Sequence, residues 1–105
     1  METRNAKIKD TMLGYEDHGI FTCCLTLDYG DSGQSAGGYA LDKWDEDKKE
    51  RIPTLFMGEQ ITKILKTVGV ESWEQLKGKY IRVKSSYSKV EAIGNLLKDE
   101  WYDFK

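Results

Sequence analysis

The stretch GIFTCCLTLDYGDSGQSAGG, residues 19–38, decides the fold because its hydrophobic side chains recur at every second position. From residue 21 to residue 29 the odd positions are hydrophobic or aromatic, and polar residues stand at most of the even ones. A period of two is typical of a β-strand with one buried face. Four glycines follow within residues 30–38. We interpret Gly30–Gly33 as a turn, followed by a returning strand that Gly37 and Gly38 interrupt.

The neighbouring segments extend this pattern. Residues 6–16 predict a weaker strand before the first, joined to it by a tight turn at residues 17–19. Residues 34–44 predict the returning third strand. Residues 42–53 are highly charged, so we expect an exposed loop that ends at the only proline.

The hydrophobic period changes after this loop. Apolar residues now recur at helical spacing, at Met57, Ile61, Ile64, Leu65 and Val68. Thr54 suits the N-cap of the helix, and Gly69 suits its C-terminal stop. Residues 72–78 predict one further helical turn.

Two more strands complete the pattern. Residues 79–86 alternate again, and residues 89–104 predict a strand that pairs with them and has a ragged aromatic end. The sequence therefore predicts a single α+β domain spanning residues 1–105. We expect an antiparallel sheet of about five strands, in the order β-β-β-α-α-β-β, with one amphipathic helix packed on one face.

Composition narrows the class of protein. The 105 residues are 39% hydrophobic and 32% charged, as in an ordinary globular domain. The formal net charge of −2 argues against a dedicated nucleic-acid binder, because such proteins concentrate basic charge. No run approaches the ~20 apolar residues of a membrane span, and the polar N-terminus lacks the hydrophobic segment of a signal peptide. We therefore expect a cytoplasmic protein.

The glycine-rich segment has two compatible interpretations. It is neither a Walker A loop nor a dinucleotide fingerprint, so its glycines can be purely structural, allowing turns and close packing. Alternatively, a ligand approaches the sheet where side chains are missing, with polar donors and tyrosines around it and basic residues for phosphate. The candidate ligand-binding residues are then Tyr29, Ser32, Gln34, Gly37, Gly38, Tyr39, Arg51, Arg82 and Lys84.

Other candidate sites favour structural roles. Glu16, Asp17 and His18 could form a general-base or metal site, but such residues between glycines are typical of a hairpin turn. Cys23 and Cys24 could be redox-active, but alternation places one in the core and the other on the opposite face. With one histidine and no CxxC pair, we expect no metal site and no cofactor.

Two further segments leave alternatives open. The charged residues 42–51 are interpreted as a solvated connection or as a flap over the Gly37–Gly38 surface. The aromatic residues near the C-terminus either close the core or build an oligomer interface; they are Trp101, Tyr102 and Phe104.

Three stretches resemble a family of small accessory proteins of tailed bacteriophages and prophages. They are MLGYEDHGIFTCCLTLDYGDSGQSAGGYALD (residues 12–42), VGVESWEQLKGKYIRVK (68–84) and IGNLLKDEWYDF (93–104). The resemblance implies a phage protein that acts in the host bacterial cytoplasm against host defence. It implies no catalytic residue, because no catalytic motif comes with it.

Three functions follow as hypotheses. The favoured one is a non-enzymatic sponge that sequesters a small phosphorylated or nucleotide-like immune signal. A domain this small would enclose such a ligand between copies, so this hypothesis predicts a homo-oligomer. The alternative is a protein-binding inhibitor of a host defence complex, similar in action to an anti-CRISPR protein. A small hydrolase built around His18 is the weakest of the three.

Overall fold

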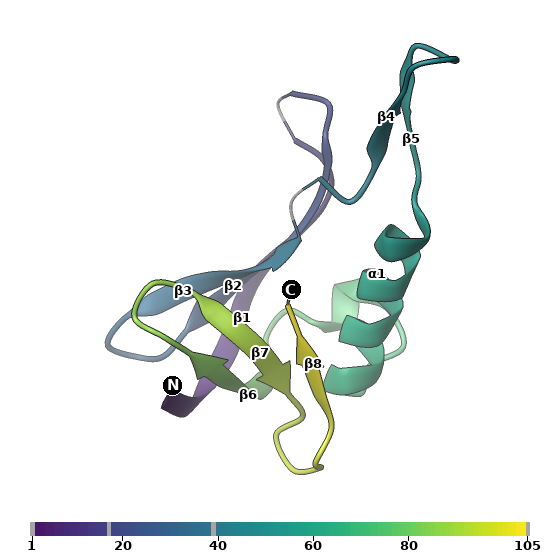
Figure 1. Ribbon diagram of the computed structural model, residues 1–105. Coiled ribbons are helices and arrows are strands. Elements are labelled where there is room, and N and C mark those ends of the chain that lie inside the picture. The colour runs from purple at the N-terminus through teal and green to yellow at the C-terminus, as the bar shows by residue number, and fades with distance from the viewer. Residues whose placement is uncertain (1, 17, 39, 105) are drawn as a thin grey trace.

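One long strand, β1 (Glu2–Tyr15), organises the fold by pairing with a different neighbour along each half of its length. The computed structural model describes residues 2–16, 18–38 and 40–104 (Figure 1). The second half of β1 pairs with β2 (Phe21–Asp28), and the first half pairs with β6 (Tyr80–Ser85). Both pairings are antiparallel, and a bulge between Ile8 and Asp10 lies where they meet.

The other strands extend the sheet on both sides of β1. β3 (Gly33–Gly38) pairs with β2, while β7 (Val90–Gly94) and β8 (Trp101–Asp103) follow β6. The resulting six-stranded antiparallel sheet has the order β3-β2-β1-β6-β7-β8. β4 (Lys43–Asp45) and β5 (Glu50–Ile52) form a separate two-stranded hairpin.

The predicted α+β class is confirmed. Helix α1 (Leu55–Val68) packs against the sheet, and a short 3₁₀ turn, η1 (Trp73–Gln75), follows it. The six-stranded sheet has one strand more than the expected five or so, and the β4–β5 hairpin is additional.

The alternating hydrophobic residues of β2 form part of the core. Cys23, Leu25 and Leu27 of β2 are each at most 1% exposed, whereas Thr26 between them is exposed. Their inner face meets the buried side chains of the neighbouring strands and of α1, chiefly Ala6, Ile8, Ile64, Ile81, Val83 and Ile93. Side chains of one face thus bury a continuous core, as the period of two predicts.

Helix α1 begins and ends as predicted. The Thr54 side chain accepts a hydrogen bond from the Met57 backbone N–H, and Gly69 closes the helix with φ of 90°. The buried stripe is rotated relative to the apolar pattern, because its most buried residues are Gln60, Ile64 and Thr67. A polar residue therefore occupies the centre of the helix–sheet interface.

The charged segment 42–53 departs from the predicted exposed loop, because most of it forms the β4–β5 hairpin. Its turn forms because the Asp45 carboxylate accepts hydrogen bonds from the backbone N–H groups of Asp47 and Lys48. Such side-chain capping is a local property of aspartate that the charge pattern does not reveal.

The C-terminal segment also departs from prediction, because residues 89–104 form two strands rather than one. The turn between β7 and β8 is held by Asn95, whose Oδ1 accepts from the backbone N–H groups of Leu97 and Lys98. The predicted aromatic end of one strand is therefore the edge strand of the sheet.

The β4–β5 hairpin is attached to the body by a buried ion pair. The β1–β2 and β4–β5 hairpins both extend beyond the body on the same side (Figure 1). At the base of the second, the Arg51 Nε lies 2.9 Å from Oδ2 of Asp42, which is 6% exposed. The other carboxylate oxygen accepts from the Phe21 backbone N–H. The adjacent Leu41 carbonyl accepts a hydrogen bond from the Thr54 hydroxyl, so the hairpins and the helix start share one junction.

Gly38→Ala is expected to destabilise the protein by about 1–3 kcal/mol, because a Cβ there would collide with the side chains of Gln60 and Leu41. Urea denaturation measures the change. The matched control is Gly58→Ala, at an exposed position of α1 with open space around it, which is expected to stabilise by about 0.5–1 kcal/mol. A loss of stability in Gly58→Ala equal to that in Gly38→Ala would contradict the steric explanation.

Asp42→Asn is expected to cost about 2 kcal/mol at neutral pH, because it removes the charged partner of Arg51. The hydrogen bond from Arg51 is the main cause that holds the pKa of the Asp42 carboxyl below its usual value. The stabilisation is therefore present above the unfolded-state pKa and is lost as the pH falls through the folded-state pKa.

Urea titrations of the wild type and of Asp42→Asn should consequently converge as the solution is acidified. Glu46→Gln, which breaks only the exposed pair with Lys49, serves as the control and should change stability by less than about 1 kcal/mol. A difference between wild type and Asp42→Asn that persists undiminished into acid would rule out the ion pair as its source.

Candidate functional site

A cleft between the β2–β3 turn and the β6–β7 turn gathers three of the candidate ligand-binding residues. We call it the β3 cleft; its volume is about 960 Å³, and it is lined by Glu2, Arg4, Tyr29, Ser32, Gly33, Gln34, Ser85, Ser86 and Tyr87. Tyr29, Ser32 and Gln34 were expected from the sequence. Arg4 and the 85–87 segment come from distant parts of the chain.

An arginine stacked on a tyrosine forms the inner wall of the β3 cleft. The Arg4 Cζ lies 4.0 Å from the centre of the Tyr29 ring, and the Tyr29 hydroxyl donates to Gln34 Oε1 at 2.6 Å. Arg4 also donates to the Asp31 carboxylate at 3.2 Å, and a second carboxylate, from Glu2, lies 3.7 Å away. The guanidinium is therefore held in place, mostly by groups that face solvent.

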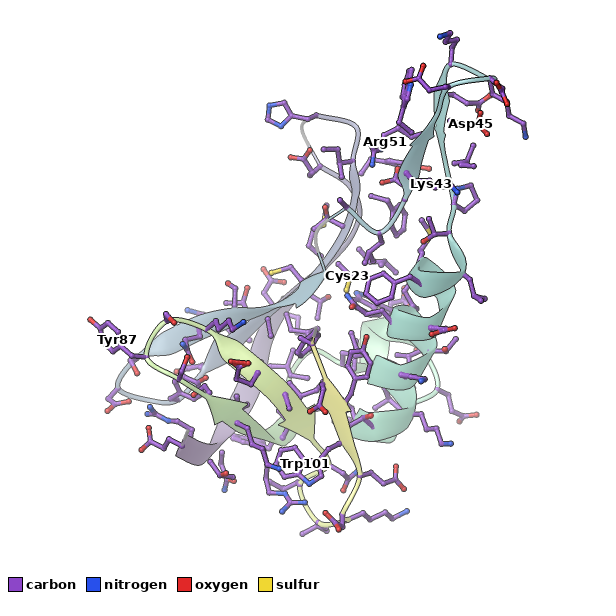
Figure 2. All side chains as sticks on the ribbon, viewed as in Figure 1. Cys23, Lys43, Asp45, Arg51, Tyr87 and Trp101 are labelled. Carbon is purple, nitrogen blue, oxygen red and sulfur yellow. The ribbon has the colours of Figure 1, made fainter. Side chains whose placement is uncertain are left out.

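Gln34 fixes the width of the β3 cleft. Its Nε2 donates to the backbone carbonyls of Ser86 and Tyr87, at 3.2 and 3.5 Å. This links the edge strand β3 to the β6–β7 turn, 52 residues further along the chain. Tyr87 projects from that turn with its side chain fully exposed (Figure 2). The cleft is thus lined by a stacked, hydrogen-bonded pair and by an exposed tyrosine.

Gly37 and Gly38 serve close packing of the protein itself. A Cβ at Gly37 would meet the Cys23 carbonyl, and one at Gly38 would meet Gln60 and Leu41. Both glycines line a second cleft of about 320 Å³, beside Phe56, Lys89 and Phe104. The space directly over Gly38 is occupied by the Gln60 side chain, so the close-packing interpretation accounts for this glycine.

Arg82 and Lys84 lie away from the β3 cleft, on the outer face of the sheet. The Trp101 indole packs over Gly94, with Arg82 Cζ 4.7 Å and Lys84 Nζ 4.2 Å from a ring centre. Arg82 also donates to the backbone carbonyls of Asn95 and Lys98, both at 2.8 Å. These two hydrogen bonds, from Nε and Nη2, hold the β7–β8 turn.

The remaining candidates do not join the cleft residues. Arg51 pairs with Asp42 at the base of the β4–β5 hairpin and donates to the Asp42 carbonyl. Tyr39 lies outside the described residues. The predicted residues that the structure describes are therefore distributed over four places in the fold: the β3 cleft, the cleft at Gly37 and Gly38, the outer face of the sheet, and the base of the β4–β5 hairpin.

Arg4 and Tyr87 are cleft residues that sequence reasoning missed. Arg4 pairs with the buried Val83 in the sheet register, so it lies on the same face as Ala6 and Ile8. A charged residue at an inward-facing position of a strand was the available signal. No comparable signal marks Tyr87, because Gln34 links its turn to β3 through backbone carbonyls, which every residue has.

His18 lies in the turn between β1 and β2, where 80% of its side chain is exposed. Its ring nitrogen is 3.3 Å from the Glu16 carboxylate. Desolvation raises the pKa of Glu16, but hydrogen bonds and charge from His18 outweigh it and hold that pKa below its usual value. Asp17 lies outside the described residues. Within residues 2–16, 18–38 and 40–104, no group of three metal-ligating side chains is brought together.

The two cysteines differ in environment, as the alternation predicts. Cys23 is buried, and burial raises the pKa of its thiol, although Gln60 donates a hydrogen bond to its sulfur at 3.1 Å. Cys24 is partly exposed. A redox pair would need both thiols to be accessible, and this geometry presents only one to solvent.

Thiol titration with a water-soluble disulfide reagent should therefore modify Cys24 quickly and Cys23 only on unfolding. Cys24→Ser is expected to remove the fast phase and to leave the slow one unchanged. Two equally fast phases in the wild type would contradict the burial of Cys23.

No family model, curated protein or solved structure matches the chain. None of the described helices is both long and apolar enough to cross a membrane.

Proposed function

We propose that this chain is a non-enzymatic phage accessory protein that sequesters a small nucleotide-like immune signal in the host bacterial cytoplasm. One observation carries the proposal: the β3 cleft is lined by an arginine stacked on a tyrosine, by Ser32 and by the fully exposed Tyr87. These are the groups that hold a base and a phosphate.

The roles follow from the geometry of the cleft. Tyr87 offers a fully exposed ring on which a base can stack, at little cost in desolvation. Arg4 offers its guanidinium to a phosphate, which would replace the exposed Asp31 carboxylate as its partner. Ser32 lines the same space, and its hydroxyl, which donates to the exposed Asp31 carboxylate, would turn to the ligand instead.

Enclosure of the ligand requires a second copy of the chain. The β3 cleft is open to solvent, and a single domain of this size does not surround a nucleotide. A homo-oligomer would cover the open side and raise the number of contacts, which supports the predicted assembly.

A second candidate function, inhibition of a host defence complex by protein binding, is favoured by the two projecting hairpins. Large hydrophobic side chains are exposed there and at the start of α1: Tyr15, Trp44, Leu55 and Phe56. Exposed apolar surface of this kind is typical of protein–protein contacts.

Native mass spectrometry with a panel of cyclic and linear nucleotides tests the proposal. The wild type is expected to form an oligomer that retains one nucleotide unchanged. Tyr87→Ala should weaken binding about fivefold or more, because base stacking on an aromatic ring contributes about 1–3 kcal/mol. Tyr80→Ala is the matched control, because Tyr80 is a largely exposed tyrosine of the outer sheet face.

Equal losses in the two tyrosine variants, or none in Tyr87→Ala, would remove the β3 cleft as the site. Conversion of the nucleotide would instead support the hydrolase, and His18→Ala would then show whether the histidine takes part. A protein that binds no nucleotide would favour the protein inhibitor.

A further inference from the structure

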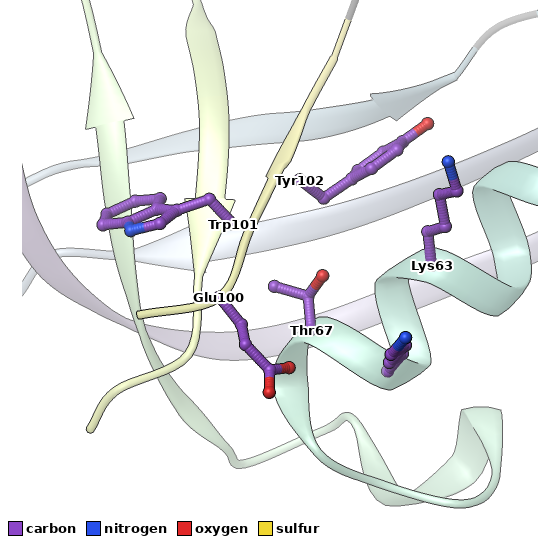
Figure 3. Close-up of a pocket in the computed structure, with 6 residues that line it drawn as sticks. Lys63, Thr67, Glu100, Trp101 and Tyr102 are labelled. Carbon is purple, nitrogen blue, oxygen red and sulfur yellow. The ribbon is translucent and has the colours of Figure 1, made fainter. Parts of the chain in front are cut away.

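A second groove lies between the edge strand β8 and helix α1, on a different part of the molecule from the β3 cleft. Its volume is about 440 Å³, and it is lined by Lys63, Lys66, Thr67, Glu100, Trp101 and Tyr102. We call it the β8 groove. Three consecutive residues of one strand segment form one wall, and one face of a helix forms the other (Figure 3).

The strand wall presents backbone to the groove. The Trp101 side chain points away from α1, onto the outer face where Arg82 and Lys84 stack on it (Figure 3). Trp101 nevertheless lines the groove. The edge of the main chain at this residue therefore borders the open space.

The hydrogen-bond pattern shows which backbone groups face outward. The Glu100 carbonyl accepts from the Asn95 N–H, and the Phe104 N–H donates to the Glu91 carbonyl, both at 2.9 Å. Since successive residues of an antiparallel strand face alternate sides, residues 100, 102 and 104 face β7. The N–H and C=O groups of Trp101 and Asp103 consequently point to the open edge of the sheet.

Hydrogen bonds between the two walls fix the width of the groove. Toward the C-terminus of α1, Asn95 Nδ2 donates to the carbonyls of Thr67 and Val68, at 3.1 and 3.2 Å. Toward the N-terminus of α1, the Tyr102 hydroxyl donates to Gln60 Oε1 at 3.1 Å. The spacing between strand and helix is therefore set before anything binds, which lowers the entropic cost of binding.

The two lysines on the helix wall of the groove favour an acidic occupant. Lys63 and Lys66 lie one helical turn apart on the α1 wall, and both ammonium groups are exposed. The opposing acid is Glu100, whose carboxylate extends toward the C-terminal end of α1, away from Lys63 (Figure 3). An extended segment along β8 would meet two positive charges on its far side.

From this geometry we infer that the β8 groove binds an extended, acidic peptide segment of a partner protein as an added β-strand. The peptide backbone pairs with Trp101 and Asp103, and its acidic side chains meet Lys63 and Lys66. Main-chain pairing supplies affinity in this mode, and the lysines supply selectivity. This function is independent of nucleotide binding in the β3 cleft.

Fluorescence anisotropy with labelled synthetic peptides tests the inference on the full chain. The first probe is a short peptide of alternating threonine and glutamate, and the second replaces glutamate by lysine. The acidic peptide is expected to bind at least about tenfold more tightly than the basic one. The charge-reversed variant Lys63→Glu/Lys66→Glu should invert this preference.

Two controls separate this mode from simple charge attraction. Lys48→Glu/Lys49→Glu makes the same charge change on exposed lysines of the β4–β5 hairpin and should leave the preference as in the wild type. An acidic peptide N-methylated at every residue, so that neither of its edges can donate backbone hydrogen bonds to β8, should lose binding about tenfold or more.

The inference is overturned if the basic peptide binds as well as the acidic one, or if the hairpin variant inverts the preference like the groove variant. Undiminished binding of the N-methylated peptide would also overturn it, because charge alone would then explain the affinity. A dimer of the protein paired through two β8 edges would show a second copy as the occupant and would equally refute the acidic peptide.

Discussion

A single buried amide joins helix α1 to two strands near opposite ends of the sheet. Gln60 is 2% exposed, donates to the Cys23 sulfur on β2 and accepts from the Tyr102 hydroxyl on β8. Strands near opposite ends of the sheet order are thereby tied to one point on the helix. Because an unpaired amide would be costly in this position, both partners must be present and correctly placed. Because Gly38 has no side chain, the Gln60 amide can lie directly against its backbone.

The same amide explains where sequence reasoning succeeded and failed on the helix. The caps Thr54 and Gly69 are local signals, and both were predicted correctly. The buried stripe follows long-range contacts instead, so a glutamine that sits among apolar residues was not recognised as part of the core. Periodicity measures hydrophobicity, and it cannot register a polar group whose partners lie 37 and 42 residues away.

The strands show a similar division. Alternation located β2 and β6 because each has one buried face, and it gave the α+β class. It did not locate the β4–β5 hairpin or the turn between β7 and β8, which depend on single capping side chains, Asp45 and Asn95.

The candidate ligand-binding residues were selected from the sequence by chemical type alone. The register of the strands places some of them on opposite faces of the sheet. Tyr29, Ser32 and Gln34 met in one cleft because they flank a single turn, whereas Arg82 lies on the opposite face of the sheet. Arg4 entered the cleft through the pairing of β1 with β6, a contact that joins the beginning of the chain to its last third.

The divided pairing of β1 also has a consequence for synthesis. Its second half pairs with β2, which is made directly afterwards, so this hairpin can close while the chain is still growing. Its first half must wait for Tyr80–Ser85, and until then one long edge of a partly formed sheet has no neighbour. Exposed strand edges attract other chains. The nascent protein is therefore most prone to mispairing in the interval between translation of the glycine-rich turn and emergence of β6 from the ribosome.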